Sequence, residues 1–133
     1  MVNPTGNSDS FGLHERLDLL ERGGVVSSTA RSATERAWSV IAEFCAAGAD
    51  DETAGQLVTH LAVALTRLDL KEPAPDLPTT VGDEIAGRTA EWRFARELAA
   101  GWEADFGQPL PEAEIGYLVV HLSVLRNRSG FAE

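Results

Sequence analysis

The sequence predicts an all-α protein folded as a compact five-helix bundle. Apolar residues recur every three or four positions in five stretches, which is the period of a helix with one buried face. No segment alternates between apolar and polar residues for long enough to indicate a strand. Turn-forming Gly, Pro and Asp residues separate the five stretches. At 44% apolar residues, the 133-residue chain has enough material for one core, so we expect a single domain.

The first two predicted helices follow a polar N-terminal stretch. Residues 1–10 are rich in Asn, Ser, Gly and Pro, so we expect a disordered tail there. The first helix should begin near Leu13 and end at Gly23, because glycine readily adopts the left-handed conformation that ends helices. After a link over residues 25–29, a second helix should run to the turn that begins at Gly48.

The remaining helices flank the longest internal loop. Residues 51–68 are apolar on more than one face, which is typical of a helix buried inside a bundle. Residues 70–78 carry three prolines and cannot continue that helix. A long helix is predicted over residues 80–106, with Gly87 as a candidate break. Pro111 suits the first turn of a last helix. The apolar row of this helix is formed by Ile115, Leu118, Leu122 and Leu125.

Charge and cysteine content argue against several classes of protein. The chain has 11 Lys and Arg against 21 Asp and Glu, a net charge of −10, with no basic stripe for binding nucleic acid directly. Cys45 is the single cysteine, so we expect neither an intramolecular disulfide nor a zinc site. No apolar run approaches the roughly 20 residues that span a bilayer, and no export signal is visible. We therefore expect a cytoplasmic protein that does not contact membranes.

Two histidines are the first candidates for chemistry near neutral pH. Arg67 follows His60 by seven residues, nearly two helical turns, so both side chains share one helix face. On the last predicted helix, Glu114 and Tyr117 precede His121 by seven and four residues and share its stripe. A carboxylate can orient an imidazole so that one ring nitrogen stays free as a nucleophile.

Each of these residues also has an ordinary structural interpretation. A lone histidine on an apolar helix is most often a hydrogen-bonded core residue, and Arg67 fits a surface side chain near a helix end. Glu114 fits the positive end of a helix dipole, and Tyr117 fits a core aromatic residue.

Other chemistries have weaker support in the sequence. His60, His121 and Glu114 could supply a metal site with two histidines and one carboxylate, although no metal-binding motif is present. No hydrolase or nucleotide-binding motif occurs either, so we expect no enzyme and no cofactor. The third histidine, His14, lies on a short amphipathic helix, and we expect it to be an exposed residue without a special role.

Two segments resemble the signatures of the phosphotransferase-system regulation domain, or PRD. In LVTHLAVALTRL, residues 57–68, a histidine opens an apolar helix and an arginine follows seven residues later. In LPEAEIGYLVVHL, residues 110–122, a Leu-Pro start precedes Glu-Ile-Gly, an aromatic residue and a histidine. With the Pro-rich loop and the long Ala/Trp helix between them, the resemblance covers nearly the whole domain, which we place at residues 11–128, followed by a C-terminal tail over residues 129–133.

The resemblance implies a regulatory function. PRDs are helical bundles that dimerise and are phosphorylated on histidine by the phosphocarrier HPr or by an EIIB-type transporter component. Carried over by motif, the phospho-acceptors would be His60 and His121, and the residues that support the phosphate would be Arg67, Glu114 and Tyr117. The chain would then be a homodimeric phosphoprotein that acts in transcription regulation through an unidentified regulatory protein.

This sequence departs from the family pattern in two places. Thr59 precedes His60, where many PRDs carry an Asp thought to orient the imidazole, which favours His121 as the more efficient acceptor. We find one PRD and no effector module, so we expect a stand-alone domain that acts through a partner. The alternative functions are a pure protein-interaction or anion-sensing module without phosphorylation, and the metal site described above.

Overall fold

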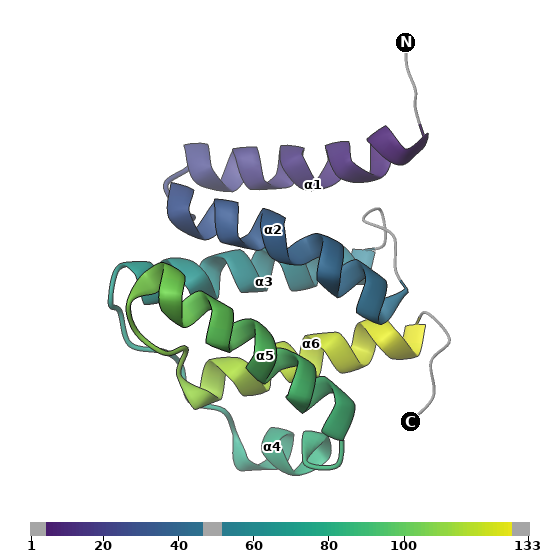
Figure 1. Cartoon of the computed structure of the whole chain (residues 1–133), viewed down its shortest axis with the longest axis vertical. Helices are drawn as coiled ribbons and strands as arrows, with labels where there is room; N and C mark the ends of the chain where they lie inside the picture. Colours follow the sequence, from purple (N-terminus) through teal and green to yellow (C-terminus); the bar gives the residue numbers. More distant parts are fainter. Residues whose placement is uncertain (1–4, 47–51, 129–133) are drawn as a thin grey trace.

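The structure, a computed structural model, describes residues 5–46 and 52–128 of the chain. All regular structure in these ranges is helical, which confirms the predicted all-α class (Figure 1). The helices in chain order are α1 (Thr5–Arg22), α2 (Ser28–Cys45), α3 (Glu52–Asp69), α4 (Thr79–Ile85), α5 (Thr89–Phe106) and α6 (Glu112–Arg128). None of them combines the length and the apolar character needed to cross a membrane.

The described part of the chain has six helices, so the predicted number of five is wrong by one. The long helix predicted over residues 80–106 is interrupted where Gly87 marked a candidate break, and it forms α4 and α5. Arg88 has φ −85° and ψ 67°, outside the helical region, and the Trp92 indole donates a hydrogen bond to the Ile85 carbonyl at 2.9 Å. The same carbonyl accepts the Arg88 backbone N–H at 3.0 Å, so the indole adds a second donor to a carbonyl at the end of α4.

The predicted N-terminal tail also needs correction. Helix α1 begins at Thr5, so residues 5–10 are helical rather than disordered. These residues contain no proline, and adding residues to a helix that has already formed is far easier than starting one. Residues 1–4 lie outside the described residues, as do residues 47–51 and the expected C-terminal tail.

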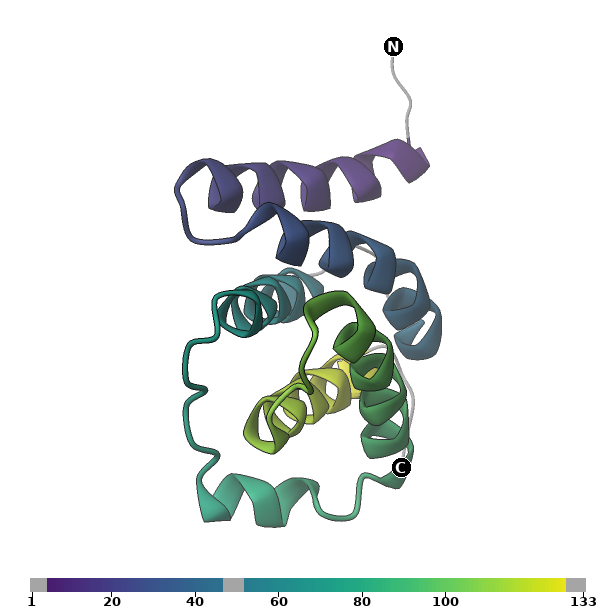
Figure 2. The same ribbon diagram turned by 60° about the vertical axis from the view of Figure 1, so that its left-hand side comes forward.

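Helices α3 and α6 lie side by side at the centre of the bundle (Figure 2). Helix α2 packs against α3, α5 packs against α6, and α1 covers α2 and α3 from the outside. Burial on several faces of α3 agrees with its apolar sequence. The largest apolar side chains with almost no exposed surface are Leu17, Ile41, Leu57, Leu61, Leu65, Leu118, Leu122 and Leu125.

The Pro-rich segment over residues 70–78 is an extended loop, as predicted, and it is anchored to α6. A Cβ atom at Gly116 would lie only 2.6 Å from Leu77 Cδ2, so the missing side chain of this glycine makes room for Leu77. The neighbouring Tyr117 hydroxyl donates a hydrogen bond to the Asp76 carbonyl at 2.8 Å. The loop is thereby held against the first turns of α6.

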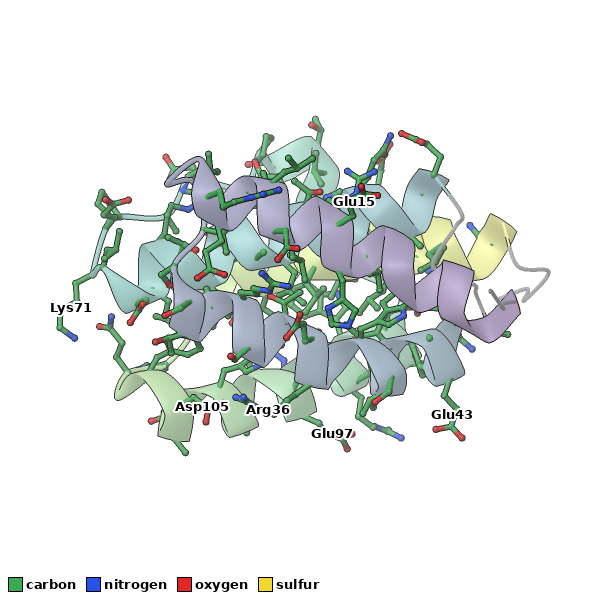
Figure 3. The ribbon with its side chains drawn as sticks, turned by 90° about the horizontal axis from the view of Figure 1, so that it is seen from above. Glu15, Arg36, Glu43, Lys71, Glu97 and Asp105 are labelled. Carbon is green, nitrogen blue, oxygen red and sulfur yellow. The ribbon has the colours of Figure 1, made fainter. Side chains whose placement is uncertain are left out.

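Charged side chains gather on the outside of the bundle. Figure 3 shows Glu43, Glu97 and Lys71 pointing away from it. At one edge, Arg36 of α2 and Asp105 of α5 form an exposed ion pair with an Nη2–Oδ2 distance of 3.3 Å (Figure 3). Such exposed pairs contribute little to stability.

Candidate functional site

The central pair of helices brings together the two histidines that the sequence singles out. His60 comes from α3 and His121 from α6, and their ring centroids are 4.6 Å apart with an interplanar angle of 33°. Both residues are partly buried, and about a quarter of the His60 side chain stays exposed. The two helices thus form one paired-imidazole site (His60 and His121) that is not sealed from solvent.

Arg67 and Glu114 form an ion pair beside this site. Arg67 donates a hydrogen bond from Nε to Oε2 of Glu114 at 2.8 Å, and its Nη2 forms an ion pair with the same oxygen at 2.7 Å. Glu114 is almost completely buried, with 2% of its side chain exposed, whereas 23% of Arg67 is exposed. The arginine that the sequence assigns to a phosphate is therefore already bonded to a carboxylate in the structure.

The other carboxylate oxygen faces an imidazole of the neighbouring helix. Glu114 Oε1 lies 3.8 Å from His60 Nε2, which is longer than a hydrogen bond. Both atoms are buried, and neither has a hydrogen-bond partner within the described residues. Sequence spacing places Glu114 on the stripe of His121, whereas the structure puts its free oxygen against His60.

The surroundings keep both imidazoles neutral at physiological pH. Burial lowers the pKa of His60, and the positive charge of Arg67 lowers it further. Burial also lowers the pKa of His121, to about 4, and the neighbouring His60 adds to this effect. A neutral imidazole keeps a lone pair on one ring nitrogen, which a nucleophile requires.

The remaining sequence candidates take different places. The Tyr117 ring lies 5.6 Å from that of His60, but its hydroxyl is bonded to the loop at Asp76 rather than offered to the imidazoles. His14 is exposed, as predicted, and its Nδ1 pairs with Glu35 Oε2 at 2.9 Å. Thr59, which precedes His60, accepts a hydrogen bond from Arg16 Nη1 of α1 at 3.1 Å.

The described residues do not support a metal site. No three His, Cys, Asp or Glu side chains among them are arranged to hold a metal ion. The arrangement at Glu114 gives a physical reason, because its Oε2 is already neutralised by a guanidinium cation. Cys45 is a buried core residue, and burial raises the pKa of its thiol to about 12, so it stays protonated.

A pocket of about 270 Å³ adjoins the Arg67–Glu114 pair. It lies at the C-terminal end of α3, where both residues line it together with Lys71, Gln108 and prolines of the adjoining loops. The Gln108 amide donates to the Leu68 carbonyl at 2.8 Å, which satisfies one of the last carbonyls of α3. Solvent can therefore approach the ion pair from the side of the loop.

A second buried carboxylate, which the sequence analysis missed, lies between α5 and α6. Glu91 is completely buried, and its Oε2 is 3.0 Å from both Arg88 Nη2 and Arg126 Nη1. Arg88 also donates from Nε to Ser123 Oγ at 3.1 Å. The i,i+3 spacing of Arg88 and Glu91 could have indicated their ion pair, whereas Ser123 and Arg126 lie 35 residues away and no spacing connects them to it.

The fold and the site define a class, namely a small all-helical domain in which two central helices present paired neutral imidazoles beside an arginine–glutamate pair. The chain belongs to the PRD family, because the sequence model of the PRD domain matches residues 40–125, more than half of the chain. The match begins within α2 and ends within α6, so it contains the whole paired-imidazole site. A PRD is a regulatory domain rather than a catalytic one. No curated protein and no solved structure matches the chain significantly.

Proposed function

We propose that this chain accepts a phosphoryl group on His60 or His121 from a phosphotransferase-system protein and thereby regulates a partner protein. The donor would be the phosphocarrier HPr or an EIIB-type component, each of which carries the group on one of its own side chains. We infer a cytoplasmic homodimer that takes part in transcriptional control through another protein.

The single observation that carries this proposal is the distance of 4.6 Å between two imidazoles from different helices. Phosphoryl transfer needs a neutral acceptor nitrogen, and the low pKa values of both rings favour the neutral form. In the transfer, the bond from phosphorus to the donor atom breaks as a new nitrogen–phosphorus bond forms on the acceptor ring. The donor atom keeps the electron pair, so no oxidant and no further reactant is needed.

Charge supports a signalling function for this step. A phosphoryl group brings about two negative charges to a chain that already carries −10. Arg67 is the cation adjoining His60, and a guanidinium can pair with phosphate through two parallel hydrogen bonds. Phosphorylation therefore changes the balance of charge between α3 and α6, which a homodimer or a partner can sense as a change in packing. The acidic surface favours a protein partner over a nucleic acid.

The partial exposure of His60 favours this function over a pure interaction module. Histidines kept only for packing would be fully buried and hydrogen-bonded. About a quarter of the His60 side chain is instead exposed, and its buried Nε2 has no hydrogen-bond partner among the described residues.

The proposal is tested by labelling the whole chain with phosphoenolpyruvate, enzyme I and HPr or an EIIB-type protein. We expect the wild type and the His14→Ala control to be labelled, each of His60→Ala and His121→Ala to be labelled less, and the double variant to stay unlabelled. Equal label on the double variant, or no label from any donor, would contradict the proposal.

A further inference from the structure

We propose that Glu114 occupies the place of the phosphate on Arg67, and that a phosphoryl group on Nε2 of His60 takes over this guanidinium and expels the carboxylate. The inference rests on the proposed function, because it concerns what happens when His60 is phosphorylated. It gives Glu114 a role opposite to the supporting one implied by the family resemblance.

The Glu114 carboxylate lies between Arg67 and His60. Two nitrogens of Arg67 lie against one oxygen, Oε2: Nε donates a hydrogen bond to it at 2.8 Å and Nη2 is ion-paired with it at 2.7 Å, so the carboxylate occupies the edge of the guanidinium that a phosphate would use. The second oxygen, Oε1, is left without a hydrogen-bond partner and faces His60 Nε2 at 3.8 Å. The buried carboxylate therefore lies between the imidazole nitrogen and the cation that a phosphate on this nitrogen would need.

A phosphoryl group on His60 would conflict with Glu114 in both space and charge. A phosphoryl group on His60 Nε2 would place three oxygens in a gap of 3.8 Å that is already bounded by Oε1 of Glu114. The group carries about two negative charges, and the facing carboxylate is an anion as well. In a partly buried site such like charges repel strongly, so both cannot stay where they are.

Arg67 would exchange the Glu114 carboxylate for the phosphate. The planar fork of Arg67 fits phosphate as well as carboxylate, and the phosphate carries the larger charge. The pocket of about 270 Å³ that Glu114 lines gives the expelled side chain room beside the loop, where water can solvate it. The bond from phosphorus to the donor atom breaks with the electron pair staying on that atom, and the bond to His60 Nε2 forms, while Arg67 changes partner.

The exchange would carry the signal out of the site. Arg67 belongs to the last turn of α3 and Glu114 to the first turn of α6, so their ion pair ties the two central helices together. The same turns of α6 hold the Pro-rich loop through Gly116 and Tyr117. Loss of the tie would loosen this end of the bundle and the loop together.

The test phosphorylates the whole chain chemically with potassium phosphoramidate and follows it by NMR. We compare the wild type with Glu114→Gln, which keeps the shape and removes the charge. The matched control is Glu112→Gln on the same helical turn, whose pair with Arg96 is exposed. We expect Glu114→Gln to raise the yield of Nε2-phosphorylated His60 about tenfold, because one opposing charge is gone. Glu112→Gln should match the wild type.

A second measurement needs no variant. In the wild type, phosphorylation should shift the Nε–H signal of Arg67, because its hydrogen-bond acceptor changes from carboxylate to phosphate. An equal or lower His60 yield in Glu114→Gln, an unmoved Arg67 signal in phosphorylated protein, or no Nε2 phosphorylation in any form would overturn the exchange. Chemical labelling that follows the expected order without any labelling by protein donors would instead refute the proposed function and leave the exchange standing.

Discussion

The two buried glutamates of this domain, Glu91 and Glu114, have similar burial but different surroundings. Glu91 and Glu114 are both almost inaccessible and both tie α6 to another helix. Two guanidinium groups neutralise Glu91, from Arg88 and Arg126, so its surroundings carry excess positive charge. Glu114 has one guanidinium and, on its other side, a neutral imidazole. The first cluster holds two helices together through two cations, whereas the second is balanced by a single cation and adjoins the imidazoles that we propose as phosphoryl acceptors.

Removal of the Glu91 carboxylate should have the largest effect on stability. Glu91→Ala leaves two mostly buried guanidinium groups without their carboxylate, so we expect a loss of about 3 to 5 kcal/mol in the free energy of unfolding. Urea denaturation followed by circular dichroism measures it. Glu97→Ala is the control on the same helix, because Glu97 is exposed and points away from the bundle (Figure 3). A loss no larger than that of the control would mean that the Glu91 cluster is not a structural tie.

Removal of Glu114 should cost less. Glu114→Ala leaves only the Arg67 guanidinium without its carboxylate. This side chain is already about a quarter exposed, and water in the adjoining pocket can solvate it. We expect a loss of about 2 kcal/mol in the same denaturation experiment. An effect as large as that of Glu91→Ala would show that the two carboxylates stabilise the fold equally.

Acid should destabilise the domain through His121 of the paired-imidazole site. The folded-state pKa of His121 is about 4, below the ordinary value of 6.5, so the unfolded chain binds a proton first as the pH falls. Stability from this group is complete above pH 6.5 and is lost between pH 6.5 and about 4. We expect a loss of about 1 to 2 kcal/mol, allowing for partial exposure.

The measurement compares the unfolding free energy of the wild type and His121→Asn across this range of pH. Carboxylates contribute to the acid sensitivity of both proteins, so the difference between the two curves isolates the imidazole. We expect the curves to converge as the pH falls, because only the wild type loses the contribution of His121. Parallel curves would contradict the low pKa of this residue.

The smallest effect should come from a change that keeps the charge of the pair. Arg67→Lys retains a cation next to Glu114 but cannot present two nitrogens of a planar guanidinium to Oε2, so we expect a loss of about 0.5 to 1 kcal/mol. Arg96→Lys is the matched control, because its pair with Glu112 is exposed. If the two substitutions cost the same, then burial does not strengthen the Arg67–Glu114 pair.

Much of the fold could be predicted because helical periodicity and turn residues are local properties of a sequence. The Pro-rich loop follows from residues that cannot continue a helix, and the break near Gly87 from a residue that disfavours one. The start of α1 could not be placed in the same way, because polar residues without proline neither require nor prevent a helical turn.

The candidate site could be predicted only residue by residue. The motifs singled out both histidines, Arg67 and Glu114, yet spacing along one helix could not reveal that Glu114 faces the imidazole of the other. Contacts between helices depend on how each helix is rotated and where it crosses its neighbour, which one sequence does not encode in any local pattern. The Glu91 cluster escaped for the same reason.

The central claim is that the paired imidazoles, rather than the most accessible histidine, accept the phosphoryl group. NMR of the whole chain after treatment with the protein donor tests it directly, since the chain has three histidines and His14, 57% exposed, is an internal control. We predict phosphohistidine signals from His60 or His121 and an unmodified His14. A phosphoryl group on His14, or three unmodified imidazoles, would contradict the account.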